Sequence, residues 1–317
     1  MKIVLTGGAG FIGSHLCARL LNEKHSVLCV DNFLTGTREN LKQFSKNKNF
    51  VLLEQDIIKP LPSSITADAV FHLASPASPN YHSKLSYHAL PLETLLVNTQ
   101  GTYELLKFSL KNKAKFLFAS SSEVYGDPLE HPQKETYYGN VSTTGPRSIY
   151  DEAKRFGETL TSYFIRVRTL DGRIGRIFNT FGPRMLKDDM RMVIAFITQG
   201  LENKPLTIFG GGSQTRSLCY IDDMVEGLMR LMFYPQTKGQ IINLGSSEEH
   251  TVIEYAKLIK KILQSKSEIV YSEKLPEDDP KKRKPDITKA RKLLGWIPKV
   301  SLQDGLGKMI EYYKKQQ

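Results

Sequence analysis

A glycine-punctuated segment at the start of the chain, MKIVLTGGAGFIGSHLCARLL (1–21), constrains the fold more than any other feature. Its first part, KIVLT, is typical of a buried β-strand and runs directly into Gly7, Gly10 and Gly13 at a G-x-x-G-x-x-G spacing. Each glycine meets a steric need: a tight turn, close backbone approach to a pyrophosphate, and close packing of helix against strand. The following helix would offer unpaired N–H groups to phosphates. The segment therefore predicts the first βα unit of a dinucleotide-binding domain.

The next strand strengthens this prediction and points to a cofactor. Glycine-rich turns alone are a weak signal, because many of them only turn the chain. Here residues 26–30 form a second apolar run, and Asp31 follows directly. A carboxylate at this place can accept hydrogen bonds from both hydroxyls of an adenosine ribose. Its charge would repel a 2′-phosphate, so we expect NAD rather than NADP.

Strand and helix patterns alternate in the first half of the chain, as a doubly wound parallel sheet requires. Apolar runs at 50–56, 68–74 and 115–120 are typical of buried strands, and the stretch at about 92–110 is typical of a helix. The loop SPASPN that follows 68–74 cannot be helical, and we expect it above the cofactor at the carboxyl edge of the sheet. The loop at 121–149 is long for a connection, which favours a functional role.

Length and composition indicate two lobes. The 317 residues, of which 40% are hydrophobic, can bury one large core and a smaller one. The longest apolar runs are strand-sized, and a chain beginning MKIVLTGG leaves no room for a signal peptide or membrane span before its first strand. We therefore expect a soluble, cytoplasmic protein without a membrane partner.

The net charge of +11 admits nucleic acid, a membrane surface or an anionic small substrate as partner. The densest basic run, KKRK at 281–284, lies beside the acidic residues 277–279 and lacks interleaved aromatic residues. This pattern favours a solvated face over a nucleic-acid stripe, so no nucleic-acid partner is expected. The three scattered cysteines, Cys17, Cys29 and Cys219, have no C-x-x-C spacing, which argues against a disulfide framework or a metal site and for packing roles.

Tyr150 and Lys154 form a candidate catalytic pair in IYDEAKR. Residues four apart on a helix lie on one face, one turn apart. An ammonium group near a phenol favours the phenolate, and it would lower the tyrosine pKa from about 10 towards a value useful for a general base. An ordinary amphipathic pair is the alternative, but the position after a dinucleotide fold and five strands favours catalysis.

Seven further motifs occur in order, and together they resemble the extended short-chain dehydrogenase/reductase family, which contains nucleotide-sugar epimerases and dehydratases. The resemblance covers nearly the whole chain and is strongest to the UDP-glucuronate decarboxylases within that family. The motifs are HLASPASP (72–79), SSSEVYGDP (120–128), HPQKE (131–135), GPRSIYDEAKR (145–155), RIFNTFGPRM (176–185), GGGSQTR (210–216) and DDPKKRKPDITKARKLLGW (278–296).

The resemblance implies an NAD-binding Rossmann domain at 1–178, with returning segments near 217–250, and a nucleotide-sugar-binding α/β lobe that is mainly 179–317. The residues that it places at NAD are Gly7, Gly10, Phe11, Ile12, Gly13, Asp31, Asn32, Asp56, Ile57, Leu73, Tyr150 and Lys154. Those that it places at the sugar nucleotide are Asn179, Arg184, Arg191, Leu206 (at the start of a segment that cups the uracil), Arg216 and Arg283. Both Arg216 and Arg283 resemble phosphate-pairing arginines, and Arg216 has a second interpretation as the proton source at C5 of the sugar.

Ser122 and Glu123 decide between the reactions of this family. At the matching position the 4,6-dehydratases carry Asp-Glu, and the 4-epimerases commonly carry neither acid. Serine removes the acid that expels a hydroxyl, while Glu123 remains for proton transfer near C5. The resemblance thus implies decarboxylation of UDP-glucuronate to UDP-xylose through a 4-keto sugar, with Tyr150, Lys154, Ser122, Glu123 and Arg216 as catalytic residues.

Three alternatives stay open: a UDP-glucuronate 4-epimerase, a 4,6-dehydratase and a non-catalytic NAD-binding regulator. The last of these usually lacks the tyrosine. Helices at 92–110 and 150–164 resemble the pair that forms a four-helix dimer bundle in this family, which implies a homodimer. Two segments depart from the pattern: the turn within 165–173 is not assigned, and the insertion-like 85–94 obscures which loop residue contacts the sugar.

Overall fold

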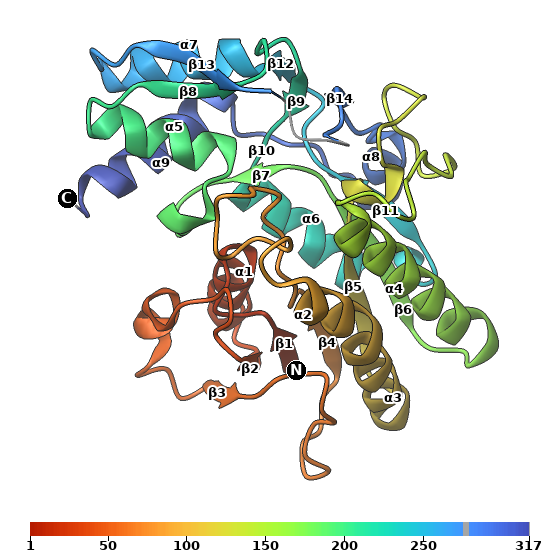
Figure 1. Cartoon of the computed structure of the whole chain (residues 1–317). Helices are drawn as coiled ribbons and strands as arrows, with labels where there is room; N and C mark the ends of the chain where they lie inside the picture. The colour runs from red at the N-terminus through yellow and green to blue at the C-terminus, as the bar shows by residue number, and fades with distance from the viewer. Residues whose placement is uncertain (275–278, 317) are drawn as a thin grey trace.

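The computed structural model describes residues 1–274 and 279–316 and is built around one seven-stranded parallel sheet (Figure 1). The strand order is β11-β6-β5-β4-β1-β2-β3. The order reverses between β1 and β4, and ligands of such sheets bind outside the carboxyl ends of the strands at that point. The strands are β1 (Lys2–Thr6), β2 (Ser26–Asp31), β3 (Phe50–Glu54), β4 (Ala69–His72), β5 (Lys115–Ser121), β6 (Gly172–Ile177) and β11 (Ile241–Leu244). The predicted doubly wound α/β fold is confirmed.

Alternate side chains of β1 enter two different cores, as the period of a strand requires. Ile3 and Leu5 pack in the larger core with Leu16 and Leu20 of the helix that follows the glycines. Their neighbour Val4 packs in the second core, on the other face of the sheet. The first face carries α1 (Phe11–Asn22) and α6 (Ile221–Phe233), and the second carries α2 (Pro91–Leu96), the π-helical turn η2 (Val97–Gly101), α3 (Thr102–Asn112) and α4 (Ser148–Val167).

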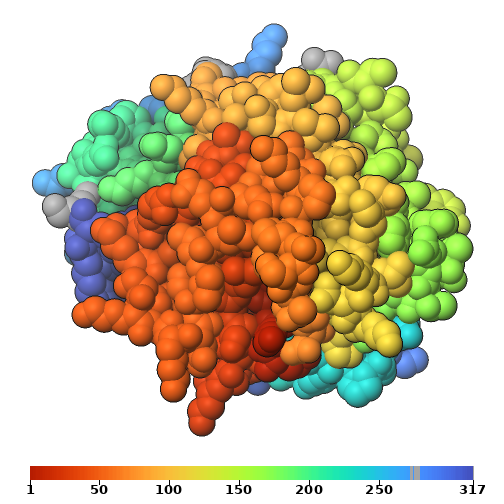
Figure 2. All heavy atoms as spheres, turned by 90° about the horizontal axis from the view of Figure 1, so that it is seen from below, coloured from red at the N-terminus to blue at the C-terminus, as the bar shows by residue number. Residues whose placement is uncertain are grey.

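Figure 2 shows the molecule from below, where the orange surface of the first third of the chain covers the centre. The yellow and green surface of the segments around α3 and α4 lies along one side of this face.

The stretch 92–110, expected to be one helix, consists of three consecutive helical pieces, α2, η2 and α3. At Gly101, where the π-helical turn ends, an added Cβ would lie 3.1 Å from the Ile57 side chain.

A second lobe lies above the sheet in Figure 1. Its parallel pair β8 (Leu206–Phe209) and β13 (Ile269–Glu273) packs with α5 (Met192–Leu201), α7 (Val252–Leu263) and α9 (Leu302–Lys314). A three-stranded sheet, β12 (Glu249–Thr251), β9 (Thr215–Ser217) and β14 (Lys282–Arg283), lies nearby. The remaining elements are β7 (Thr180–Phe181), β10 (Cys219–Tyr220), α8 (Thr288–Leu294), η1 (Arg38–Phe44), η3 (Ser122–Tyr125), η4 (Lys187–Asp189) and η5 (Pro235–Thr237).

The unassigned turn within 165–173 joins α4 to β6. The helix continues to Val167, and Gly172 begins the strand rather than marking the helix end. A Cβ at Gly172 would lie 2.7 Å from the Ile165 side chain, so this glycine allows the strand to pass close to the helix.

Three features of composition have structural counterparts. All three cysteines are buried and free. Among the described residues, no helix is both long and apolar enough to cross a membrane. Within the same residues, no group of three or more His, Cys, Asp or Glu side chains is arranged to hold a metal ion.

Candidate active site

A pocket opens at the carboxyl ends of the parallel strands, where the strand order reverses. Its lining comes from the glycine turn and from the ends of β2, β3, β4, β5 and β6, together with the start of α4. All twelve residues expected at the cofactor line it: Gly7, Gly10, Phe11, Ile12, Gly13, Asp31, Asn32, Asp56, Ile57, Leu73, Tyr150 and Lys154. Ser122, Glu123, Asn179 and Arg191 line it as well.

The glycine turn, residues 7–13, lines this pocket and packs backbone against backbone. Gly7 has a φ of +73°, and a Cβ there would lie 2.7 Å from the backbone of Ala74. A Cβ at Gly13 would lie only 2.0 Å from the Gly7 carbonyl oxygen. The turn thus leaves bare backbone at the first turn of α1, where N–H groups favour phosphate. This cradle fits the pyrophosphate of a dinucleotide.

Asp31 ends β2 and faces the same pocket. Its Oδ2 accepts the Ala9 N–H at 2.9 Å, and its Oδ1 accepts the Phe33 N–H at 2.9 Å. Burial raises the Asp31 pKa above its ordinary value, although these two hydrogen bonds act in the opposite direction. Each carboxylate oxygen can accept a further hydrogen bond. The carboxylate is therefore fixed in orientation and able to bind ribose hydroxyls.

Tyr150 and Lys154 lie on one face of α4, as the spacing predicts, but their electrostatics differ from the prediction. Burial raises the Tyr150 pKa, and it lowers the Lys154 pKa to about 7. The Lys154 Nζ lies 5.6 Å from the centre of the Tyr150 ring and donates to the Ala119 carbonyl oxygen at 2.9 Å. The groups that lower the Tyr150 pKa are a hydrogen bond with Ser121 and the charge of Arg191. The predicted lowering of the Tyr150 pKa by Lys154 is wrong, because desolvation of the buried phenol is the largest influence and raises this pKa.

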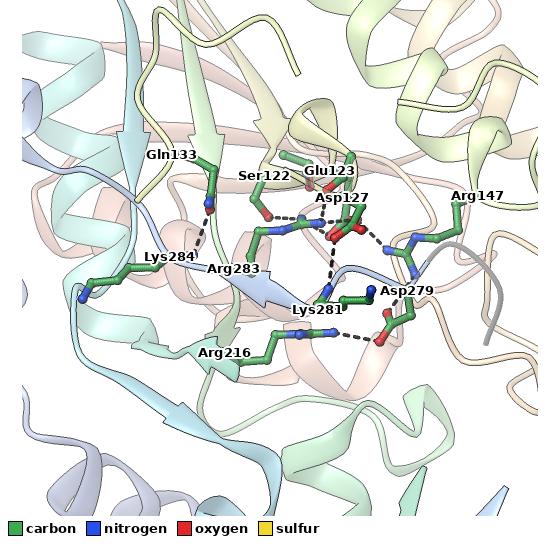
Figure 3. A network of polar contacts seen from close by, with 12 residues as sticks. Ser122, Glu123, Asp127, Gln133, Arg147, Arg216, Asp279, Lys281, Arg283 and Lys284 are labelled. Atoms are coloured by element: carbon green, nitrogen blue, oxygen red, sulfur yellow. Dashed lines mark hydrogen bonds and ion pairs between the residues drawn. The ribbon is translucent and has the colours of Figure 1, made fainter. Parts of the chain in front are cut away.

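Glu123 lies between two arginines from distant parts of the chain (Figure 3). Its Oε1 accepts from Arg283 Nη1 at 2.6 Å, and its Oε2 accepts from Arg147 Nη2 at 2.5 Å. Burial acts to raise the Glu123 pKa, but the charges of Arg283 and Arg147 outweigh burial and lower that pKa to about 2. Beside it, the Ser122 hydroxyl accepts from Arg283 Nη1 at 2.9 Å. Glu123 is therefore a fixed carboxylate at neutral pH.

Asp279 extends this network to a third arginine. Its Oδ2 accepts from Arg216 Nη2 at 2.8 Å, and its Oδ1 accepts from Arg147 Nη1 at 3.4 Å (Figure 3). We call Glu123, Arg147, Arg216, Asp279 and Arg283 the arginine cluster. Of the cluster, Glu123 and Arg147 line the pocket. Arg283 contacts Glu123 directly, and Arg216 is connected to Arg147 through Asp279.

The sequence predicted that the basic run KKRK forms one solvated face, and this prediction is wrong for Arg283. Lys281 and Lys282 are exposed, whereas Arg283 is 2% exposed because its guanidinium enters the arginine cluster. Of the acidic residues expected beside this run, only Asp279 is among the described residues, and Glu277 and Asp278 lie outside them.

Two residues expected at the substrate are placed elsewhere. Arg184 donates to the Ser14 carbonyl oxygen at 3.1 Å and to Gln43 Oε1 at 2.9 Å, outside the pocket lining. Leu206 is fully buried at the start of β8, and its N–H donates to the Glu268 carbonyl oxygen at 2.7 Å. The Leu206 side chain packs in the hydrophobic core, and a role for either residue at the sugar nucleotide stays a prediction.

Sequence reasoning also missed three residues of the site. Arg147 lies within GPRSIYDEAKR, three residues before Tyr150, and its place in that motif was a signal that could have found it. Ser121, rather than Ser122, is the serine bonded to the Tyr150 side chain. The Tyr87 ring stacks on the Tyr150 ring with centroids 5.0 Å apart, and the insertion-like segment 85–94 gave no signal for this contact.

Comparison with known proteins places this site in context. The profile described as "NAD dependent epimerase/dehydratase family" matches residues 3–245. UDP-glucuronic acid decarboxylase 2 of Arabidopsis thaliana is 46% identical over 318 residues, which cover 99% of this chain and 68% of the plant protein. UDP-glucuronic acid decarboxylase 1 of Danio rerio is 46% identical, over 99% of this chain and 73% of the fish protein.

A solved structure with a different named activity shares the fold. The UDP-glucuronic acid 4-epimerase of Bacillus cereus, in complex with UDP-glucuronic acid and NAD, is 31% identical and superposes with a TM-score of 0.86. The superposition covers 100% of both chains.

Proposed function

The chain belongs to the NAD dependent epimerase/dehydratase family, and from this premise we propose that it decarboxylates UDP-glucuronate to UDP-xylose. The observation that carries the proposal is the arrangement at the end of β5, where Ser122 and Glu123 lie in a pocket with Tyr150 and are held by arginines. Identity of 46% over 99% of this chain to proteins named UDP-glucuronic acid decarboxylases supports the same assignment.

The residues present fit NAD as the cofactor. The glycine turn offers bare backbone for a pyrophosphate, and Asp31 offers an oriented carboxylate for ribose hydroxyls. Because Asp31 would repel a 2′-phosphate, NAD is preferred to NADP. When bound, NAD would accept hydride from C4 of the sugar and later return it, so that it is retained rather than consumed.

Tyr150 is the group that takes the proton of the C4 hydroxyl. Burial keeps this side chain protonated at rest, so proton transfer depends on the groups that stabilise its anion. In the described part of the chain, Ser121 supplies a hydrogen bond and Arg191 supplies positive charge. The proton returns from Tyr150 to the same oxygen when C4 is reduced, so Tyr150 acts as base and then as acid.

Loss of carbon dioxide follows from the chemistry of a β-keto acid. Oxidation at C4 places a ketone β to the C6 carboxylate, and the electrons of the C5–C6 bond can then delocalise into that ketone. The hydroxyl groups of Tyr150 and Ser121, which are hydrogen-bonded to each other, would stabilise the resulting enolate oxygen. Glu123 is ionised and its oxygens are bound by arginines. The Ser122-Glu123 pair therefore lacks the free acid that expulsion of a hydroxyl group requires.

A 4-epimerase is the second candidate, because the Bacillus cereus enzyme named for that reaction superposes over the whole chain. It would share the cofactor site and the anionic substrate and would invert C4 without losing a carbon. Mass spectrometry of the product from UDP-glucuronate and NAD separates the two. We expect loss of the mass of carbon dioxide; a product of unchanged mass would move the assignment to the 4-epimerase.

We further propose that the protein forms a homodimer through α2, α3 and α4. Each of these helices exposes large apolar side chains, and patches of such side chains mark protein interfaces. They are Leu92 (67% exposed), Leu96 (43%), Tyr103 (41%), Phe156 (49%), Tyr163 (43%) and Val167 (61%). We expect light scattering at micromolar concentration to report a dimer, and Phe156→Glu to shift it towards monomer. Leu129→Glu, at an exposed loop residue, is the matched control and should leave the dimer intact.

A further inference from the structure

The polar groups of the proposed reaction lie on one short segment at the end of β5. Ser121 is hydrogen-bonded to the Tyr150 side chain, and the two residues after it contact Arg283. We call residues 120–125 the serine turn. A displacement of about 1 Å in such groups can lower a rate about 100-fold, because catalysis depends on their orientation. The contacts that hold the serine turn in place therefore bear on the reaction.

Glu158 of α4 and Arg176 of β6 form a buried ion pair next to the serine turn. Arg176 donates to one carboxylate oxygen from Nε at 2.8 Å and to the other from Nη2 at 2.7 Å. Contact at two points fixes the orientation of both planar groups. Glu158 is 8% exposed and Arg176 is 9% exposed, and in the described chain neither side chain lines the pocket. A role of this pair in the reaction must therefore pass through other residues.

This ion pair contacts both ends of the serine turn. At the first end, the Ser120 hydroxyl donates to Glu158 Oε1 at 2.5 Å. At the last end, the Tyr125 hydroxyl accepts from Arg176 Nη1 at 2.8 Å and donates to Asn243 Oδ1 of β11 at 2.8 Å. The Arg176 guanidinium also lies 4.8 Å from the centre of the Tyr125 ring, which adds a cation–π contact. The rest of the turn lies between these two anchors.

The same carboxylate continues the catalytic face of α4. Tyr150, Lys154 and Glu158 follow one another at intervals of four residues, which places them on one side of the helix. Lys154 Nζ donates to the Ala119 carbonyl oxygen at 2.9 Å, and Glu158 accepts from the next residue of β5. Burial lowers the Lys154 pKa, and the negative charge of Glu158 acts against this lowering. Two successive residues of β5 are thus bound to two successive turns of α4, and these contacts set the position of Tyr150 relative to the serine turn.

Strand β6 carries a second buried arginine that serves as a comparison. Arg173 is 1% exposed, and its Nη2 donates to Asp171 Oδ1 at 2.7 Å. Asp171 also accepts from Lys115 Nζ at 2.9 Å. Lys115 begins β5 and Arg173 lies near the start of β6, so this group lies at the amino ends of the strands, whereas the pocket lies at their carboxyl ends. The strand therefore holds two arginine–carboxylate pairs, of which one is remote from the reaction.

We propose that Glu158 and Arg176 are positioning residues for the reaction, and that their ion pair sets the place of the serine turn against Tyr150. This inference rests on the proposed function. The pair acts through Ser120 and Tyr125, the two residues of the turn that it contacts. A change in the pair should slow the chemical steps, whereas NAD binding, which depends on the glycine turn, should remain.

Glu158→Gln tests the proposal, because it keeps the side-chain length and removes the charge that Arg176 faces. The matched control is Asp171→Asn, which makes the same chemical change at the other arginine of β6. For each protein, kcat, KM for UDP-glucuronate, NAD affinity by calorimetry and the melting temperature are measured. We expect Glu158→Gln to lower kcat about 100-fold, with KM and NAD affinity within about threefold of wild type. Asp171→Asn should also lower the melting temperature, because it weakens a buried ion pair, but should keep kcat within about twofold of wild type.

Tyr125→Phe separates the serine turn from the ion pair itself. It removes the hydroxyl group that contacts Arg176 and Asn243 and leaves the ion pair in place. The Glu158 charge stays one helical turn from Lys154, so a lower kcat in this variant cannot come from a changed charge next to that lysine. We expect Tyr125→Phe to lower kcat about tenfold with unchanged KM.

The split between kcat and the binding constants distinguishes positioning from a structural role. Equal losses of kcat in Glu158→Gln and Asp171→Asn would overturn the proposal, and so would a loss of NAD affinity in Glu158→Gln as large as its loss of kcat. If Glu158→Gln does not fold, Tyr125→Phe decides by itself, and a wild-type kcat in that variant would overturn the proposal. A wild type that turns over UDP-glucuronate without releasing carbon dioxide would instead overturn the proposed function, and the variants would then be compared with wild type on the product that forms.

Discussion

The glycine turn and the arginine cluster both contribute residues to one pocket, and they are built in contrasting ways. The turn is one continuous segment of backbone that is packed too closely for side chains. A Cβ added at Gly13 would lie 2.0 Å from the nearest backbone atom. The arginine cluster is assembled from charged side chains that lie up to 160 positions apart in the chain, as Glu123 and Arg283 do. The comparison shows that the structure of the glycine turn depends on close backbone packing, whereas that of the arginine cluster depends on charge. Substitutions should therefore separate cofactor binding from sugar chemistry.

The largest effect should come from Tyr150→Phe, which removes the phenolic hydroxyl group that would carry the proton and leaves the glycine turn and the arginine cluster in place. General acid–base catalysis contributes about 10²–10⁴-fold, and we expect kcat to fall by at least that range. Affinities for NAD and UDP, measured by calorimetry, should change little. Activity that survives this change would show that another residue acts as the base.

Glu123→Gln should disrupt the arginine cluster and leave the glycine turn intact. The substitution keeps the side-chain shape but removes the anion that Arg147 and Arg283 share. We expect carbon dioxide release to slow about 100-fold, with unchanged NAD affinity and a partly surviving first formation of NADH. If both steps run at wild-type rates in a stopped-flow experiment, Glu123 is only a structural support of the loop.

Gly13→Ala should have the opposite effect: it should distort the glycine turn and leave the arginine cluster intact. The new Cβ would lie 2.0 Å from the Gly7 carbonyl oxygen, so the turn must move. We expect a loss of about 1–3 kcal/mol in the free energy of unfolding, and at least a tenfold weaker affinity for NAD. Gly307→Ala on α9 is the control of opposite sign, because no atom lies within 4 Å of its added Cβ. It should stabilise the protein by about 0.5–1 kcal/mol. Equal effects of the two changes would refute the steric account.

The smallest effect concerns His15, which joins the helix after the glycine turn to the second lobe. Its Nε2 lies 3.0 Å from the Pro183 carbonyl oxygen, and burial together with the charge of Arg184 lowers the His15 pKa to about 4. A histidine that stays neutral when folded binds a proton more readily when unfolded. Stability should therefore fall as the pH decreases from 6.5 to about 4.

His15→Gln retains a donor for the Pro183 carbonyl and has no ring to protonate. Over that pH range, we expect it to lose about 1–3 kcal/mol less than the wild type. Denaturant titrations at pH 4.5 and pH 7 measure the difference. An identical pH dependence in both proteins would show that other groups, such as buried His72, carry the effect.

The same contrast explains how far the sequence predicts the molecule. The glycine turn, Asp31 and the strands of the sheet were predicted because each is a local pattern with one steric or periodic meaning. The Tyr150–Lys154 pair was found by its spacing, but its titration was predicted wrongly because burial depends on the whole fold. The neighbours of Glu123 could not be derived from spacing, since Arg283 is 160 residues away. Arg184 and Leu206 matched motifs whose positions a pattern alone does not fix.

Nuclear magnetic resonance with UDP-glucuronate carrying ¹³C at C6 tests the central claim most directly. The protein, a small amount of NAD and an excess of the labelled substrate are followed in one sample. The account predicts that the label leaves the sugar as carbon dioxide and bicarbonate, that UDP-xylose forms in equal amount, and that NAD is not consumed. A label that stays in a sugar carboxylate, with new signals from a C4 epimer, would contradict it.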